Sequence, residues 1–97
     1  MTTETNTEDR PPLVVPVVHL NGTGRQALLR QLSEVGVAIA KAADKLREAA
    51  PNGRDYYPAG PEAMTAAVAQ FERRLGVLRG LQDELRAEMA AIETAGR

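Results

Sequence analysis

The chain has 97 residues, which allows one small domain. Hydrophobic residues make up 43% of it but aromatic residues only 3%, so its apolar content is mostly Ala, Leu and Val. The chain has no cysteine, which excludes disulfides and thiolate metal sites. It has one His and one Ser, which argues against a Ser-His-Asp triad or a His-rich zinc site. The net charge of −1 gives no general attraction to nucleic acids or anionic membranes. We therefore expect no enzyme, no metal site and no cofactor.

The N-terminal segment, residues 1–12, is polar and acidic and has no apolar residue after Met1. Because such a segment buries too little surface to offset its ordering entropy, we expect it to be a disordered tail. It lacks the basic and apolar regions of a signal peptide, and the chain has no apolar run long enough to cross a membrane. We therefore expect a cytoplasmic protein without a membrane partner.

Residues 13–22 follow as an apolar arm and a turn. The sequence LVVPVVHL at 13–20 is rich in Val and Leu, which favours a strand, but Pro16 cannot donate to a sheet. No other segment is a strand candidate, so the arm is either an edge strand that pairs with another copy or an extended arm outside any sheet. Asn21-Gly22 indicates a turn.

The first helix is expected at residues 23–50. Thr23 and Gln26 have the spacing of a capping box, and Pro51-Asn52-Gly53 ends the pattern. Apolar residues recur every four and three positions, as in a coiled coil: Leu28, Leu32, Val35, Ile39, Ala42, Leu46 and Ala49.

A loop at residues 51–60 leads to a second helix at residues 61–95, with Pro61 in its first turn. This helix has the same alternation of four and three: Met64, Val68, Phe71, Leu75, Leu78, Gln82, Leu85, Met89 and Ile92.

The predicted fold is all-α: an antiparallel, coiled-coil-like two-helix hairpin over residues 23–96, with a short extended N-terminal arm. Apolar residues also flank both seams, so each helix has a wider apolar surface than one neighbour can cover. We therefore expect a homo-oligomeric helical bundle. The alternative is a monomeric hairpin closed by the arm at 13–20.

The loop between the helices is the first candidate binding site. It brings together Asn52, Arg54, Asp55, Tyr56 and Tyr57, which include both tyrosines of the chain. Tyrosine rings stack on flat ligands, Arg forms a fork on phosphate, and Asp accepts hydrogen bonds from sugar hydroxyls. The alternative is structural, with the tyrosines covering the end of the core and Arg54 paired locally.

The start of the first helix is the second candidate. Thr23 and Arg25 stand beside two glycines at a helix N-terminus, where free N–H groups attract anions. The alternative is an ordinary capped helix start.

Two motifs, HLNGTG at 19–24 and PNGRDYYPAGP at 51–61, resemble those of small uncharacterised proteins of phages and prophages. The resemblance covers roughly residues 17–93, although Gly24 stands where that group has a small hydroxyl residue. It implies a phage-borne accessory protein that acts in the host cytoplasm.

These features support two functional interpretations. One is an oligomeric bundle that binds a small phosphorylated ligand and sequesters a nucleotide signal of host immunity, an anti-defence role. The other is a structural or interaction protein whose hairpin docks a host or phage partner. Catalysis is the weakest interpretation, because no pair of nucleophile and base is evident.

Overall fold

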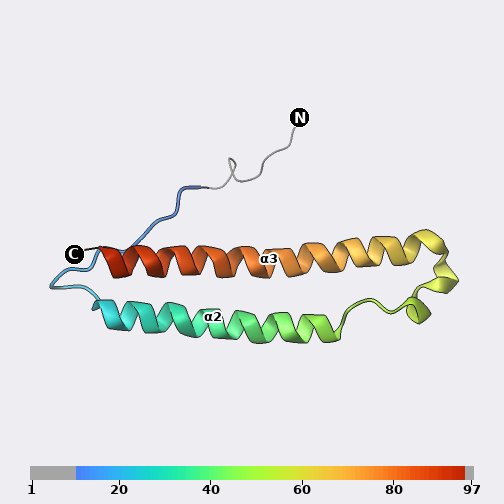
Figure 1. Ribbon diagram of the computed structural model, residues 1–97, viewed down its shortest axis with the longest axis horizontal. Coiled ribbons are helices and arrows are strands. Elements are labelled where there is room, and N and C mark those ends of the chain that lie inside the picture. Colours follow the sequence, from blue (N-terminus) through green and yellow to red (C-terminus); the bar gives the residue numbers. More distant parts are fainter. Residues whose placement is uncertain (1–10, 96–97) are drawn as a thin grey trace.

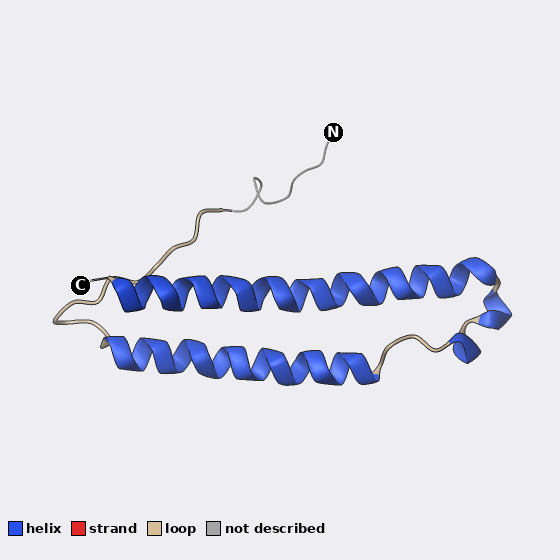
Figure 2. Ribbon diagram, in the orientation of Figure 1, coloured by secondary structure: helices blue, strands red, loops and turns tan. Residues whose placement is uncertain are grey.

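The computed structural model describes residues 11–95, which form an all-helical hairpin without any strand (Figures 1 and 2). The order is the arm, helix α2 (Arg25–Glu48), two 3₁₀ turns (Gly53–Asp55 and Tyr57–Ala59) and helix α3 (Pro61–Thr94). The antiparallel hairpin is thereby confirmed. Residues 1–10 of the expected disordered tail lie outside the described residues. Within the described range, no helix is apolar over the length that a membrane crossing requires.

The two helices differ in length. Helix α2 has 24 residues and α3 has 34, or about 36 and 51 Å at 1.5 Å per residue. The start of α2 lies beside the end of α3, as hydrogen bonds from Arg25 to Ile92 and Ala95 show. The first turns of α3 therefore extend past the end of α2, and the second 3₁₀ turn packs against them (Figure 1).

Helix α2 begins two residues later than predicted. Its N-cap is Gly24, whose carbonyl accepts from Leu28 N at 3.0 Å, and no side chain caps it. The predicted capping box of Thr23 and Gln26 is wrong, because Thr23 precedes the cap position. The helix ends at Glu48, ahead of Pro51.

Helix α3 begins as its sequence predicts. Pro61 occupies the first turn, where its missing N–H removes no helical hydrogen bond. Gly60 precedes it with φ +102°, a conformation that other residues adopt only with strain. At the other end, the Thr94 hydroxyl donates to Ala90 O at 3.2 Å.

The core is a narrow seam between the helices. Five hydrophobic residues are buried, and Ile92 is the most completely buried of them: Ile39, Ala43, Ala67, Leu75 and Ile92. Around them, half-buried residues of the predicted seams complete the contact: Leu28, Leu32, Leu46, Met64, Phe71, Leu78, Gln82, Leu85 and Met89.

At two positions the buried residue is not the one predicted from the heptads but its neighbour in the sequence. In α2, Ala43 is buried in place of Ala42, and Val35 is 45% exposed. In α3, Ala67 is buried in place of Val68. A straight helix has 3.6 residues per turn and drifts against a seven-residue repeat, so the contact shifts to an adjacent residue.

The segment 13–20 is an irregular arm and not a strand. It runs beside the start of α2 and the end of α3, where Val15, Val18, Arg25 and Ala95 help to line a shared pocket. Leu20 is almost fully exposed. The arm covers one end of the hairpin and leaves much of its own apolar surface in solvent.

Candidate functional site

The backbone of the loop between the helices is held by local hydrogen bonds. Asn52 Oδ1 accepts from Arg54 N at 2.9 Å, and Asn52 O accepts from Asp55 N at 2.9 Å. Tyr56 N then donates to Gly53 O at 3.0 Å. An Asn side chain that caps the residue two positions ahead is a common way to start a tight turn. The role of Asn52 is thus to shape the loop.

Most of the candidate side chains that follow Asn52 are exposed. Arg54 and Asp55 are exposed, and within residues 11–95 neither forms a side-chain hydrogen bond or an ion pair. Tyr56 is half-buried, whereas Tyr57 is 76% exposed. The structural alternative, in which both tyrosines cover the core, is therefore wrong for Tyr57, and the predicted local pairing of Arg54 does not occur.

The second candidate, Thr23 with Arg25, lies at the opposite end of the molecule (Figure 1). The length of α2, about 36 Å, separates it from the loop. The two sets of predicted site residues therefore cannot form one site within a single chain. An antiparallel hairpin requires this separation, so the predicted fold already implied that the two candidate sites lie far apart.

Arg25 has a structural contact that the sequence did not reveal. Its Nε donates to Ile92 O at 3.2 Å, and its guanidinium also donates to Ala95 O. These carbonyls belong to the end of α3, where the helix dipole favours a positive charge. Arg25 thus fastens the two helix ends together, and its charge is already engaged there.

The HLNG sequence forms a compact turn. Gly22 N donates to His19 O at 3.1 Å, which confirms the turn predicted at Asn21-Gly22. A Cβ at position 22 would lie 2.7 Å from His19 Nε2, so any larger residue there would need the exposed imidazole ring to turn away. The observed position of the His19 ring against the turn thus favours glycine at position 22.

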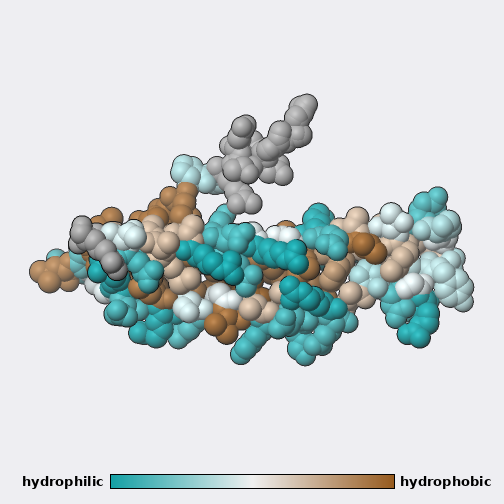
Figure 3. Space-filling model, viewed as in Figure 1, coloured by the Kyte–Doolittle hydropathy of each residue, from teal (hydrophilic) through white to brown (hydrophobic). Residues whose placement is uncertain are grey.

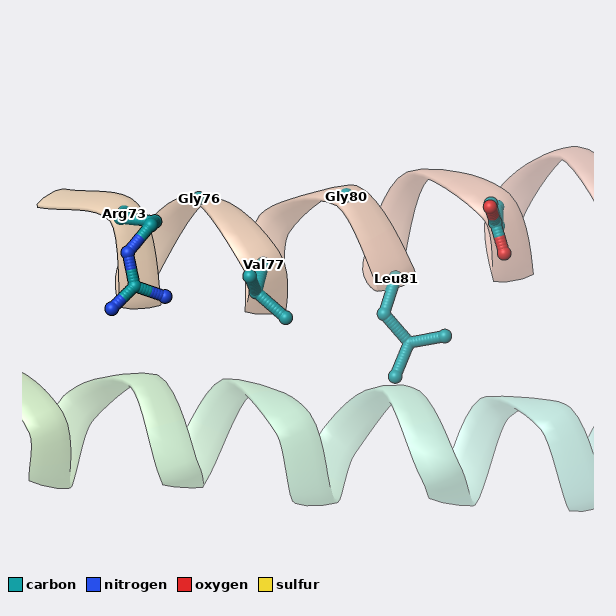
Figure 4. A pocket seen from close by; sticks show the side chains of 6 residues that line it. Arg73, Gly76, Val77, Gly80 and Leu81 are labelled. Carbon is teal, nitrogen blue, oxygen red and sulfur yellow. The ribbon is translucent and has the colours of Figure 1, made fainter. Parts of the chain in front are cut away.

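Apolar side chains are also exposed along both helices, as the brown atoms between teal ones in Figure 3 show. Val37 is 53% exposed, Val77 63% and Leu81 42%. Val77 and Leu81 lie in a shallow groove that α3 forms by itself, here called the α3 groove (Figure 4). Its lining residues are Arg73, Gly76, Val77, Gly80, Leu81 and Glu84.

Comparison of the chain with protein-family models, with curated proteins and with solved structures gives no match.

Proposed function

We propose that this chain is a non-enzymatic accessory protein that acts through protein–protein contacts as an assembled helical bundle. The observation that carries the proposal is the distribution of apolar residues. Two of the five buried residues are alanines, while Val37, Val77 and Leu81 are 42–63% exposed. A hairpin of this size has little core to stabilise it, and apolar patches on a helix are buried when it associates.

The resemblance of the two loop motifs to phage and prophage proteins supports an accessory role in a phage. In this interpretation, the His19–Gly22 turn and the Asn52 cap give the hairpin fixed ends. The exposed helical faces between those ends provide the contact surface. Self-association and docking of a host or phage partner would use the same kind of apolar face.

The test is the molar mass of the purified full chain in solution, from light scattering coupled to size exclusion. We expect a mass of at least two copies of the 10.4 kDa chain at high micromolar concentration. Val77→Lys should lower that mass and retain the helical signal in circular dichroism, because the side chain is 63% exposed in the single hairpin. A folded monomer at every concentration would contradict self-assembly.

Ligand binding by the loop is a second candidate function. The specific observation in its favour is that Tyr57 and Arg54 are exposed on a backbone fixed by Asn52 and by the positive φ of Gly60. A fixed loop with a free ring and a free guanidinium is suited to stack on a base and to bind a phosphate. The ligand class that fits is a small nucleotide, as in sequestration of a nucleotide signal.

Calorimetric titration with a panel of mononucleotides and cyclic nucleotides tests this second function. Arg54→Ala should abolish binding and leave the melting temperature unchanged, because an exposed arginine contributes little to stability. Tyr57→Ala should weaken binding more than Tyr57→Phe, which retains the stacking ring. If no nucleotide binds the unaltered chain at high micromolar concentration, the loop is not a nucleotide site.

A further inference from the structure

The α3 groove combines two exposed aliphatic side chains with two glycines. Val77 and Leu81 project from the helix, while Gly76 and Gly80 leave its surface without side chains (Figure 4). Among the described residues, nothing within 4 Å would meet a Cβ at Gly76, so residues 11–95 leave the helix surface open there. The groove thus has projections and hollows one turn apart, and α2 does not line it.

The groove residues are arranged so that the groove is complementary to a second copy of itself running in the opposite direction. Consider a point midway between Leu78 and Arg79. Reversing the helix about that point brings Val77 to the same level along the axis as Gly80, and Leu81 to the same level as Gly76. Each layer of the contact then combines one large side chain with one residue that has none.

The charges at the two ends of the groove follow the same symmetry. Arg73 and Glu84 are equally far from the midpoint, so reversal places the guanidinium of one copy near the carboxylate of the other. The next positions outward on this face are Gln70 and Ala87, which are both exposed and again equidistant. An isologous contact requires this kind of self-complementarity, and paired opposite charges fix its register.

We infer that the α3 groove binds the α3 groove of a second copy, with the two helices antiparallel about a two-fold axis between Leu78 and Arg79. This inference rests on the proposed self-assembly and specifies its partner, surface and direction. Glycines permit close approach of the two backbones. The contact from Gln70 to Ala87 is about 26 Å long, which is short for a stable interface. Micromolar affinity is therefore expected.

Cysteine cross-linking tests this arrangement directly, because the chain has no cysteine of its own. We would prepare Gln70→Cys and Ala87→Cys as separate full-length proteins. In the antiparallel dimer, residue 70 of one copy lies opposite residue 87 of the other. Identical positions lie about 26 Å apart along the axis, far beyond the reach of a disulfide. A mixture of the two proteins should therefore form disulfide-linked dimers on mild oxidation, and neither protein should do so alone.

A matched control uses the same helix on another face. Glu72→Cys mixed with Arg86→Cys has exposed residues at nearly the same distances from the midpoint, but they point away from the groove. This mixture should give little cross-linking. Efficient cross-linking of either Gln70→Cys or Ala87→Cys alone would show a parallel arrangement and overturn the inference.

A second variant examines the close approach. Gly76→Gln adds a polar side chain where the single hairpin has open space, and Gln favours helix more than Gly does. It should retain full helical content but weaken dimerisation at least ~10-fold, which corresponds to about 1.4 kcal/mol. Ala90→Gln, at an exposed position of α3 outside the groove, should leave dimerisation unchanged.

The two levels of the proposal can fail separately. If the chain self-associates but the mixture of Gln70→Cys and Ala87→Cys does not cross-link, the copies meet through another surface. The inference about the α3 groove is then wrong, while the proposed assembly stands. If the chain stays monomeric at high micromolar concentration, both are wrong.

Discussion

Ile39 and Val35 provide the sharpest test of how α2 packs. A regular heptad places both residues in the seam, but the structure leaves Ile39 7% exposed and Val35 45% exposed. Truncation of a buried Ile to Ala usually costs about 2–5 kcal/mol, through lost burial and the cavity that remains. Val35→Ala removes a smaller side chain that is half in solvent, so its cost should be about 1 kcal/mol or less.

The assay is thermal and urea unfolding of both variants, followed by circular dichroism. For a domain of this size 1 kcal/mol corresponds to roughly 4–8 °C, so Ile39→Ala should lower the melting temperature by ~10 °C or more. The two variants form a matched pair, because each replaces a β-branched residue of α2 by Ala and gains similar helix propensity. Equal losses of stability would show that the regular heptad face, and not the observed one, meets α3.

Two further changes follow from the same geometry. Ala43→Gln should destabilise the hairpin by ~1–3 kcal/mol, because Ala43 is buried. Ala42→Gln, at the exposed neighbouring position, should change the unfolding free energy by less than ~0.5 kcal/mol. Comparable urea midpoints for the two variants would contradict the observed rotation of α2. Arg25→Ala should lower the unfolding free energy by about 1–2 kcal/mol, because the last carbonyls of α3 lose a charged hydrogen-bond donor. Arg25→Lys should recover part of that loss. An unchanged melting temperature of Arg25→Ala would show that this contact does not stabilise the hairpin.

Local signals account for what the sequence predicted correctly. Pro51 and Gly53 end the first helix, Pro61 starts the second, and Asn21-Gly22 makes a turn. Each depends on the backbone preferences of a few adjacent residues. The hairpin then follows from two apolar seams joined by a short loop.

What the sequence could not provide depends on how the helices meet. Ala43 is buried where the sequence predicted Ala42, because the rotation of α2 about its own axis decides which residue meets α3. The apolar repeat determines that rotation only to within one residue. The contact of Arg25 with Ile92 joins residues 67 positions apart. Likewise, the exposure of Tyr57 depends on the tertiary path of the loop.

The antiparallel dimer also bears on the loop. If two α3 helices pair in opposite directions, the two loops lie at opposite ends of the assembly. Each Arg54–Tyr57 loop would then be an independent site with a stoichiometry of one nucleotide per chain. Nucleotide titration and oligomeric state can therefore be measured as separate properties.

Sedimentation equilibrium of the full chain, from low to high micromolar concentration, measures whether the hairpin pairs with a second copy. We expect a reversible transition from a folded hairpin of 10.4 kDa to a species of twice that mass. The Gly76→Gln variant should shift this transition to higher concentration. A helical monomer over the whole range, for both proteins, would contradict it.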